Sequence, residues 1–128
     1  MSAPAAVRFD DGKHNAWLWP WTRRELVQND RVFVSLAQYV AIRMCVRNGD
    51  LDRADALWRR AAEPSVSGVA AASYDVLQDA IFLLLARNPG KALLLRETRA
   101  IPIESEKVPN VAAAWMRVRD ELFTTKQS

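Results

Sequence analysis

The feature that most constrains the fold is the apolar run AIFLLLA at residues 80–86. It lies in a longer segment whose apolar residues recur at three- and four-residue steps, the period of one face of an α-helix. These residues are Val76, Leu77, Ala80, Ile81, Leu84 and Leu85. Because the stretch FLLLA is apolar on nearly every side, we expect this helix to lie at the centre of the domain, covered by other elements. The run is far too short to span a lipid bilayer.

The segment WTRREL at residues 21–26 predicts the start of the first helix. Thr22 and Glu25 have the spacing of a capping box, in which each side chain hydrogen-bonds to the backbone N–H of the other residue. Trp21 and Leu26 have the spacing of a hydrophobic staple, which would flank that box. We therefore expect the helical part of the chain to begin at Thr22.

Further helix signals follow along the chain. Residues 32–44 carry a helical apolar face that ends at Asn48-Gly49, although RVFVS at its start favours a strand. Other helices are expected after Asp50, from a start between Ser67 and Ser73, after Asn88 and after Asn110. The stretches 65–68 and 100–109 are expected to be loops. The sequence predicts an all-α fold, a compact five- or six-helix domain at 22–124, with an extended N-terminal arm at 1–21 and a polar tail at 125–128.

The length and the charge of the chain limit the classes of protein to consider. Its 128 residues, half of them apolar, suit one domain with a real core. Eighteen Lys and Arg face fifteen Asp and Glu, an excess smaller than that of most proteins that coat phosphates. Cys45 is the only cysteine, so no intramolecular disulfide is possible. The first residues do not resemble a signal peptide, and we expect a cytoplasmic location.

The residue types that carry most catalytic chemistry are scarce. His14 is the only histidine, and it precedes the first expected helix, where a solvated surface position is expected. Cys45 lies in an apolar helical context that favours a core role. Glu104 and Glu106 are two residues apart in an expected loop, where carboxylates are usually solvated. No phosphate-binding glycine loop and no nucleophile elbow occur. The sequence therefore predicts no enzyme activity, no metal site and no cofactor.

The sequence NAWLWPWTRRE at residues 15–25 holds three of the five tryptophans. Trp and Arg are the residues most enriched at the energetic centres of protein interfaces. Trp21 has the local explanation of the staple, whereas Trp17 and Trp19 have none. We expect partner binding at Trp17, Trp19, Arg23 and Arg24. An extended arm of this kind can lie across its own core, a homodimer mate or another protein, and it would adhere only weakly to a membrane.

The stretch GDLDRADALWRRAAEP, from Gly49 to Pro64, resembles the second half of a tetratricopeptide repeat. The likeness rests on small Ala54 and Ala61, aromatic Trp58 and the closing Pro64. It covers a single helical hairpin, and no second copy appears at the family's period. The resemblance implies tight helix packing and protein–protein binding.

Two hypotheses for the function follow. The first is a non-catalytic regulatory protein that binds another protein and alters its activity, as inhibitors, anti-activators, immunity proteins and adaptors do. The alternative is a nucleic-acid-associated helical regulator, since residues 57–78 have the helix, turn and second helix expected of a helix-turn-helix motif. The second helix of that motif would present Asp75 and Asp79 to phosphates, which makes DNA an unfavourable partner.

Overall fold

The computed structural model describes residues 6–10, 13 and 15–123, so His14 and the predicted tail at 125–128 lie outside the described residues. The all-α prediction is wrong, because the fold combines helices with two small sheets. In the first sheet β1 (Val7–Arg8) pairs in parallel with β4 (Ile103–Glu104). In the second, β2 (Arg23–Gln28) pairs antiparallel with β3 (Arg31–Ser35).

The β2–β3 hairpin replaces the predicted first helix. Asn29 and Asp30 have φ angles of 52° and 65°, the left-handed conformation of both central residues in the two-residue turns that suit hairpins. Thr22 caps no helix, since its hydroxyl donates to the Ala16 carbonyl. The strand-favouring residues of RVFVS give β2 a pairing partner, and Leu26 is fully buried. This tertiary arrangement overrides the local capping signal.

The helical hairpin that follows agrees better with the sequence. Helix α1 (Leu36–Arg47) begins after Ser35, whose hydroxyl accepts from the Gln38 N–H at 3.1 Å. It ends at the predicted stop signal, Asn48-Gly49, and Gly49 has a φ of 78°, a conformation that favours glycine. Helix α2 (Leu51–Trp58) begins at the predicted cap, with the Asp50 carboxylate accepting from the Arg53 N–H. The end of α1 and the start of α2 are confirmed, whereas α1 was expected to begin near Asn29-Asp30 and instead follows β3.

The remaining helices contain one that the sequence did not predict. The expected loop at 65–68 is wrong in part, because α3 (Val66–Ala70) begins there. Helices α4 (Tyr74–Arg87) and α5 (Pro89–Glu97) follow the prediction closely. Helix α6 (Pro109–Phe123) already includes Asn110, so this residue does not cap the helix as predicted. Its side-chain amide donates instead to the carbonyls of Val69 in α3 and of Ala72 just after α3.

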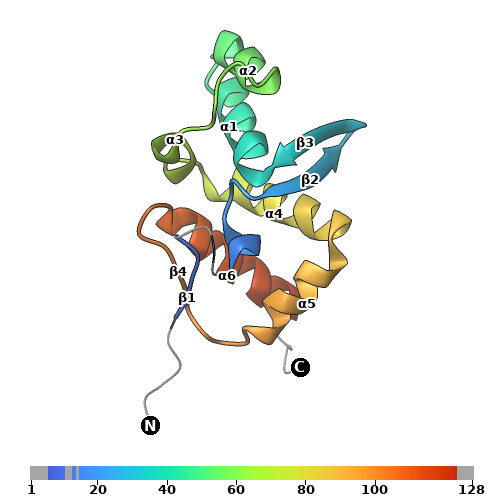
Figure 1. Ribbon diagram of the computed structural model, residues 1–128, viewed down its shortest axis with the longest axis vertical. Coiled ribbons are helices and arrows are strands. Elements are labelled where there is room, and N and C mark those ends of the chain that lie inside the picture. Colours follow the sequence, from blue (N-terminus) through green and yellow to red (C-terminus); the bar gives the residue numbers. More distant parts are fainter. Residues whose placement is uncertain (1–5, 11–12, 14, 124–128) are drawn as a thin grey trace.

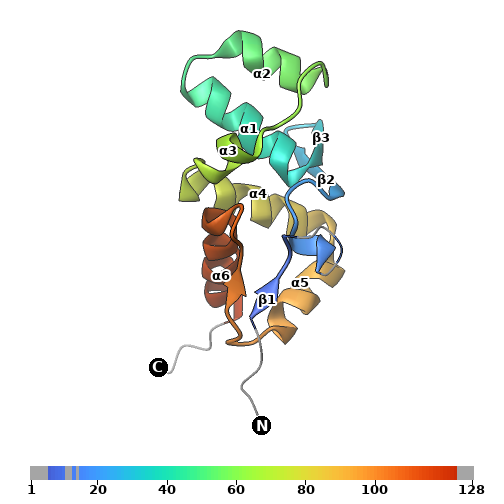
Figure 2. The same ribbon diagram turned by 60° about the vertical axis from the view of Figure 1, so that its left-hand side comes forward.

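Helix α4 crosses the middle of an elongated molecule (Figure 1). The turned view places α1, α2 and α3 on one side of it and α5, α6 and β1 on the other (Figure 2). Helix α4 contacts α1, β2, α5 and α6. All six residues of its predicted apolar stripe are buried: Val76, Leu77, Ala80, Ile81, Leu84 and Leu85. The central position of this helix is confirmed.

The described residues of the N-terminal arm fold back onto their own chain. A short 3-10 helix, η1 (Ala16–Leu18), buries Leu18 completely. The Leu18 carbonyl accepts from the indole N–H of fully buried Trp115 at 3.2 Å. Trp17 meets Trp115 edge-on with ring centres 5.5 Å apart. Residues near the start of the chain therefore complete the core around α6.

Asp10 fastens the N-terminal segment to the loop before α6. Its carboxylate accepts from the Ser105 hydroxyl at 2.5 Å and from the Glu106 N–H at 2.9 Å. Burial by itself raises the pKa of the Asp10 carboxyl, but the hydrogen bonds from Ser105, Glu106 and Lys107 outweigh it and lower the pKa below its usual 3.8.

We expect the contact at Asp10 to stabilise the protein above about pH 4 and to weaken in stronger acid. A carboxyl whose pKa is lowered by folding contributes stability that disappears as the pH falls through its folded-state pKa. Asp10→Ala should lower the free energy of unfolding by about 1–2 kcal/mol at pH 7. Urea denaturation at a series of pH values should show the difference from the unchanged protein shrinking below pH 3.8. A constant difference down to pH 2 would contradict the prediction.

Candidate functional site

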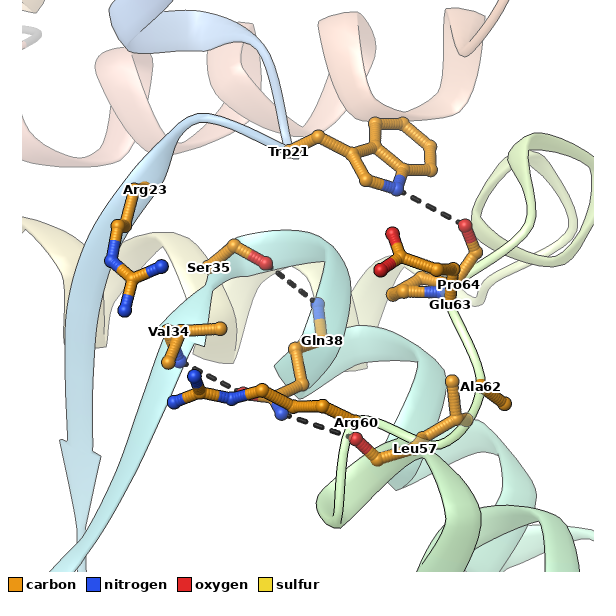
Figure 3. Close-up of a pocket in the computed structure, with 10 residues that line it drawn as sticks. All are labelled: Trp21, Arg23, Val34, Ser35, Gln38, Leu57, Arg60, Ala62, Glu63 and Pro64. Atoms are coloured by element: carbon orange, nitrogen blue, oxygen red, sulfur yellow. Dashed lines mark hydrogen bonds between the residues drawn. The ribbon is translucent and has the colours of Figure 1, made fainter.

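A pocket of about 180 Å³ lies between the β2–β3 hairpin, the start of α1 and the segment that follows α2 (Figure 3). Each wall comes from a different part of the chain, so the pocket depends on the hairpin that replaced the predicted helix. The lining residues are Trp21, Arg23, Val34, Ser35, Gln38, Leu57, Arg60, Ala62, Glu63 and Pro64.

The buried side chain of Gln38 joins two walls of this pocket. Its amide oxygen accepts from the Val34 N–H at 2.8 Å, and its amide nitrogen donates to the Leu57 carbonyl at 3.2 Å. Only 5% of Gln38 is exposed, so both amide ends have their partners away from water. Across the pocket, the Trp21 indole N–H donates to the Pro64 carbonyl at 3.1 Å. These bonds hold the hairpin, α1 and the post-α2 segment in fixed relative positions.

Three charged side chains line the pocket. The side chains of Arg23, Arg60 and Glu63 form no hydrogen bond or ion pair with any of the residues that the structure describes. In Figure 3 the two guanidinium groups extend toward Val34, whereas the Glu63 carboxylate lies beside Pro64. Two cations against one anion leave an excess of positive charge. Guanidinium groups with free donors are well suited to bind carboxylates.

The backbone at Arg60 is in a conformation that favours glycine. Its φ is 62°, and it directly follows Arg59, the residue that caps α2. Helices commonly end with a left-handed residue at this position, and that residue is usually glycine because a side chain there costs about 1 kcal/mol. Arginine is therefore less favourable than glycine at position 60, but its side chain contributes to the lining of the pocket. Strain of this kind at a pocket is a reason to test for function.

Two exposed apolar side chains are close in sequence to residues that line the pocket. Trp58, at the end of α2, is 39% exposed, and Val32 of β3 is 47% exposed. The Trp58 ring packs against Phe33 with ring centres 5.2 Å apart. The Arg31 guanidinium lies 5.9 Å from the centre of the same ring. The surface thus combines a partly exposed aromatic ring with cationic groups, a composition typical of protein interfaces.

The residues expected to bind a partner differ in exposure and in the surroundings of their side chains. Trp17 and Trp19 are partly buried and pack against the core, with Trp19 in contact with both Phe9 and Trp21. Arg23 is exposed and lines the pocket. Arg24 is partly buried, and its guanidinium donates to the Arg23 carbonyl at 2.8 Å.

Sequence reasoning missed Arg60, Glu63 and Gln38 as members of the pocket. Gln38 lies off the apolar face of the predicted helix, so the helical spacing gives no sign that its amide is buried and needs partners. The conformation of Arg60 gives no signal in the sequence, since glycine is the residue expected at that position.

Cys45 lies on α1, away from this pocket. Burial raises the pKa of its thiol, with a smaller effect in the same direction from Asp50. Within the described ranges, no three His, Cys, Asp or Glu side chains come together as metal ligands would. Nor does any helix in the described part of the chain have the length and apolar character to cross a membrane.

Comparisons with known proteins gave no relative: no family model, curated protein or solved structure matches this chain.

Proposed function

We propose that this protein is a non-catalytic regulatory protein that binds another protein at the pocket between the β2–β3 hairpin and α2. The observation that carries the proposal is that the guanidinium groups of Arg23 and Arg60 line one pocket and have no partner among the residues that the structure describes. The partner that suits this chemistry presents an acidic side chain to the pocket and an apolar side chain to Trp58 and Val32. We expect the protein to act in the cytoplasm, as a monomer or a homodimer, by occupying a surface that its partner needs.

The charge distribution supports an acidic protein segment over a nucleic acid. Around α2, the sequence contains as many aspartates as arginines: Asp50, Asp52 and Asp55 with Arg53, Arg59 and Arg60. Arg59 is already paired with Asp55 at 3.0 Å. A surface that coats phosphates needs a continuous excess of cations, because each contact neutralises one backbone charge. A single carboxylate that binds between two arginines needs only a local excess of positive charge, and the pocket lining has such an excess.

The proposal predicts a sequence preference in displayed random peptides. Those selected on the immobilised protein should be enriched in Asp or Glu beside an apolar residue. Arg60→Gly should weaken their binding about tenfold, equivalent to about 1.4 kcal/mol. The same substitution should leave stability within roughly 1 kcal/mol of the unchanged protein, because glycine accepts the positive φ without strain. Calorimetric titration of a selected peptide measures the first effect, and urea denaturation measures the second.

Arg53→Gln is the matched control, since it removes an exposed arginine of α2 that lies outside this pocket. It should leave peptide affinity unchanged, whereas Trp58→Ala should reduce it. Selected peptides without acidic residues, or equal binding by the Arg60→Gly variant, would refute the proposal. Binding of random-sequence DNA that weakens steeply with added salt would support the nucleic-acid alternative instead.

A further inference from the structure

A second cationic pocket lies in the half of the molecule opposite α2, where the end of α5 meets the last turns of α6 (Figure 1). Its volume is about 350 Å³, which falls in the lower range of small-molecule sites. The lining residues are Arg96, Arg99, Ala100, Arg119, Asp120 and Phe123. Three guanidinium groups against one carboxylate leave the lining with two excess positive charges. This pocket shares no residue with the one proposed above to bind protein.

Arg119 gives this pocket a fixed donor. Only 6% of the residue is exposed, and no ion pair joins its guanidinium to any residue in the described part of the chain. One terminal nitrogen, Nη1, donates to the Thr98 hydroxyl at 2.9 Å and to the Ile101 carbonyl at 2.7 Å. These two bonds fix the plane of the guanidinium. The guanidinium is therefore held in position by two neutral acceptors.

The other edge of the Arg119 guanidinium is free. Nε is buried without a hydrogen-bond partner among the described residues, and Nη2 also donates to none of them. These two N–H groups form the side-on fork that binds two oxygens of a carboxylate or a phosphate. A buried donor left unpaired costs about 1–3 kcal/mol, so an unpaired fork on a residue that lines a pocket is a reason to look for an anion.

Arg99 repeats at α5 the backbone feature that Arg60 shows at α2. It follows Thr98, the residue that caps α5, and its φ is 53°. The side chains of Arg96 and Arg99 pair with no carboxylate in the described residues. Here too an arginine occupies a position where glycine would relieve strain, and here too it lines a pocket. The side chains of Arg96 and Arg99 therefore line the same pocket as Arg119.

We propose that this second pocket binds the phosphate group of a small organic phosphate monoester. A monoester carries close to two negative charges at neutral pH, which matches the excess of the lining. Its oxygens would accept from the free fork of Arg119 and from Arg96 and Arg99. The pocket is larger than a phosphate ion, and Ala100 and Phe123 give it an apolar side for the organic part of the ligand. A carboxylate offers half the charge and is the weaker ligand.

The test titrates the purified protein with sodium phosphate and with phenyl phosphate, at an ionic strength held constant with sodium chloride. Calorimetry should show saturable binding of both probes, with phenyl phosphate at least threefold tighter because of its ring. Arg99→Gly should weaken both about fivefold, and Arg96→Gln combined with Arg99→Gly should abolish binding. Glycine suits the φ of residue 99, so these variants should keep their far-ultraviolet circular dichroism.

Two further variants distinguish a specific binding site from general electrostatic attraction of anions to the protein surface. Arg119→Lys keeps the charge but loses the fork, and it should weaken phenyl phosphate at least tenfold. Arg53→Gln removes a distant arginine and should change nothing. Equal weakening in Arg53→Gln and Arg99→Gly, or no saturable binding at all, would overturn the proposal. Phosphate and phenyl phosphate of equal affinity would overturn the assignment of an organic ligand.

Discussion

Replacing Trp115 by alanine should lower the free energy of unfolding by about 4 kcal/mol, a large part of the total for a domain of this size. Trp115 is fully buried on α6, and its ring packs against Trp17. Alanine would leave a cavity at the junction of the N-terminal segment and α6. It would also remove the donor for the buried Leu18 carbonyl. Urea denaturation followed by circular dichroism measures the loss.

Two variants test that explanation. Trp115→Phe keeps an aromatic ring but loses the N–H donor and part of the indole volume, so it should cost about 1–3 kcal/mol, less than alanine. Trp58→Ala removes a tryptophan that is 39% exposed and should cost less than the buried one. A Trp115→Ala protein that unfolds at the same urea concentration as the unchanged protein would show that the N-terminal segment does not complete the core.

Replacing Gln38 by alanine should lower the free energy of unfolding by about 1–3 kcal/mol. The substitution leaves the Val34 N–H without its acceptor and removes the side-chain bond to the Leu57 carbonyl, which still accepts from the Arg60 N–H at 3.2 Å. Because these groups belong to β3 and α2, the change should also loosen two walls of the protein-binding pocket. Hydrogen exchange at Val34, followed by nuclear magnetic resonance, should become faster, and binding of the selected peptides should weaken in parallel.

The Gln38→Glu variant tests the two hydrogen bonds of Gln38 separately. An ionised glutamate can still accept from the Val34 N–H, but it has no proton to donate to the Leu57 carbonyl. Its stability should lie between those of the alanine variant and the unchanged protein. It should rise relative to the unchanged protein on mild acidification, when the carboxyl gains the missing proton. A Gln38→Glu protein as stable as the unchanged one at pH 7 would mean that the bond to Leu57 contributes nothing.

The helical core could be predicted because its signals are local. The stripe of α4 and the boundaries at Gly49 and Asp50 follow from spacing and cap chemistry within a few residues. The Thr22–Glu25 pair shows where such signals fail. A capping box is worth about 1 kcal/mol, less than the pairing and burial that a partner strand offers to Leu26. That competition takes place between segments and cannot be read from residues 21–26 alone.

The candidate site was predicted only in part, for the same reason. Arg23 was among the residues expected to bind a partner, and it does line the pocket. Arg60 lines the same pocket as Arg23 only because the fold brings the β2–β3 hairpin close to the end of α2. Strands as short as β1 and β4 have no periodicity, so their parallel pairing depends on segments ninety-six residues apart and gives no sequence signal.

The distance between these paired segments has a consequence for synthesis on the ribosome. Leu18 and Trp115 are 97 positions apart, and the Asp10 contact with Lys107 spans the same separation. At about 5–20 residues per second, the N-terminal segment would wait roughly 5–20 seconds for the residues on which it packs. Throughout that interval Trp17, Leu18 and Trp19 are apolar groups on an incomplete chain. The nascent protein therefore offers a chaperone a binding sequence that folding later removes.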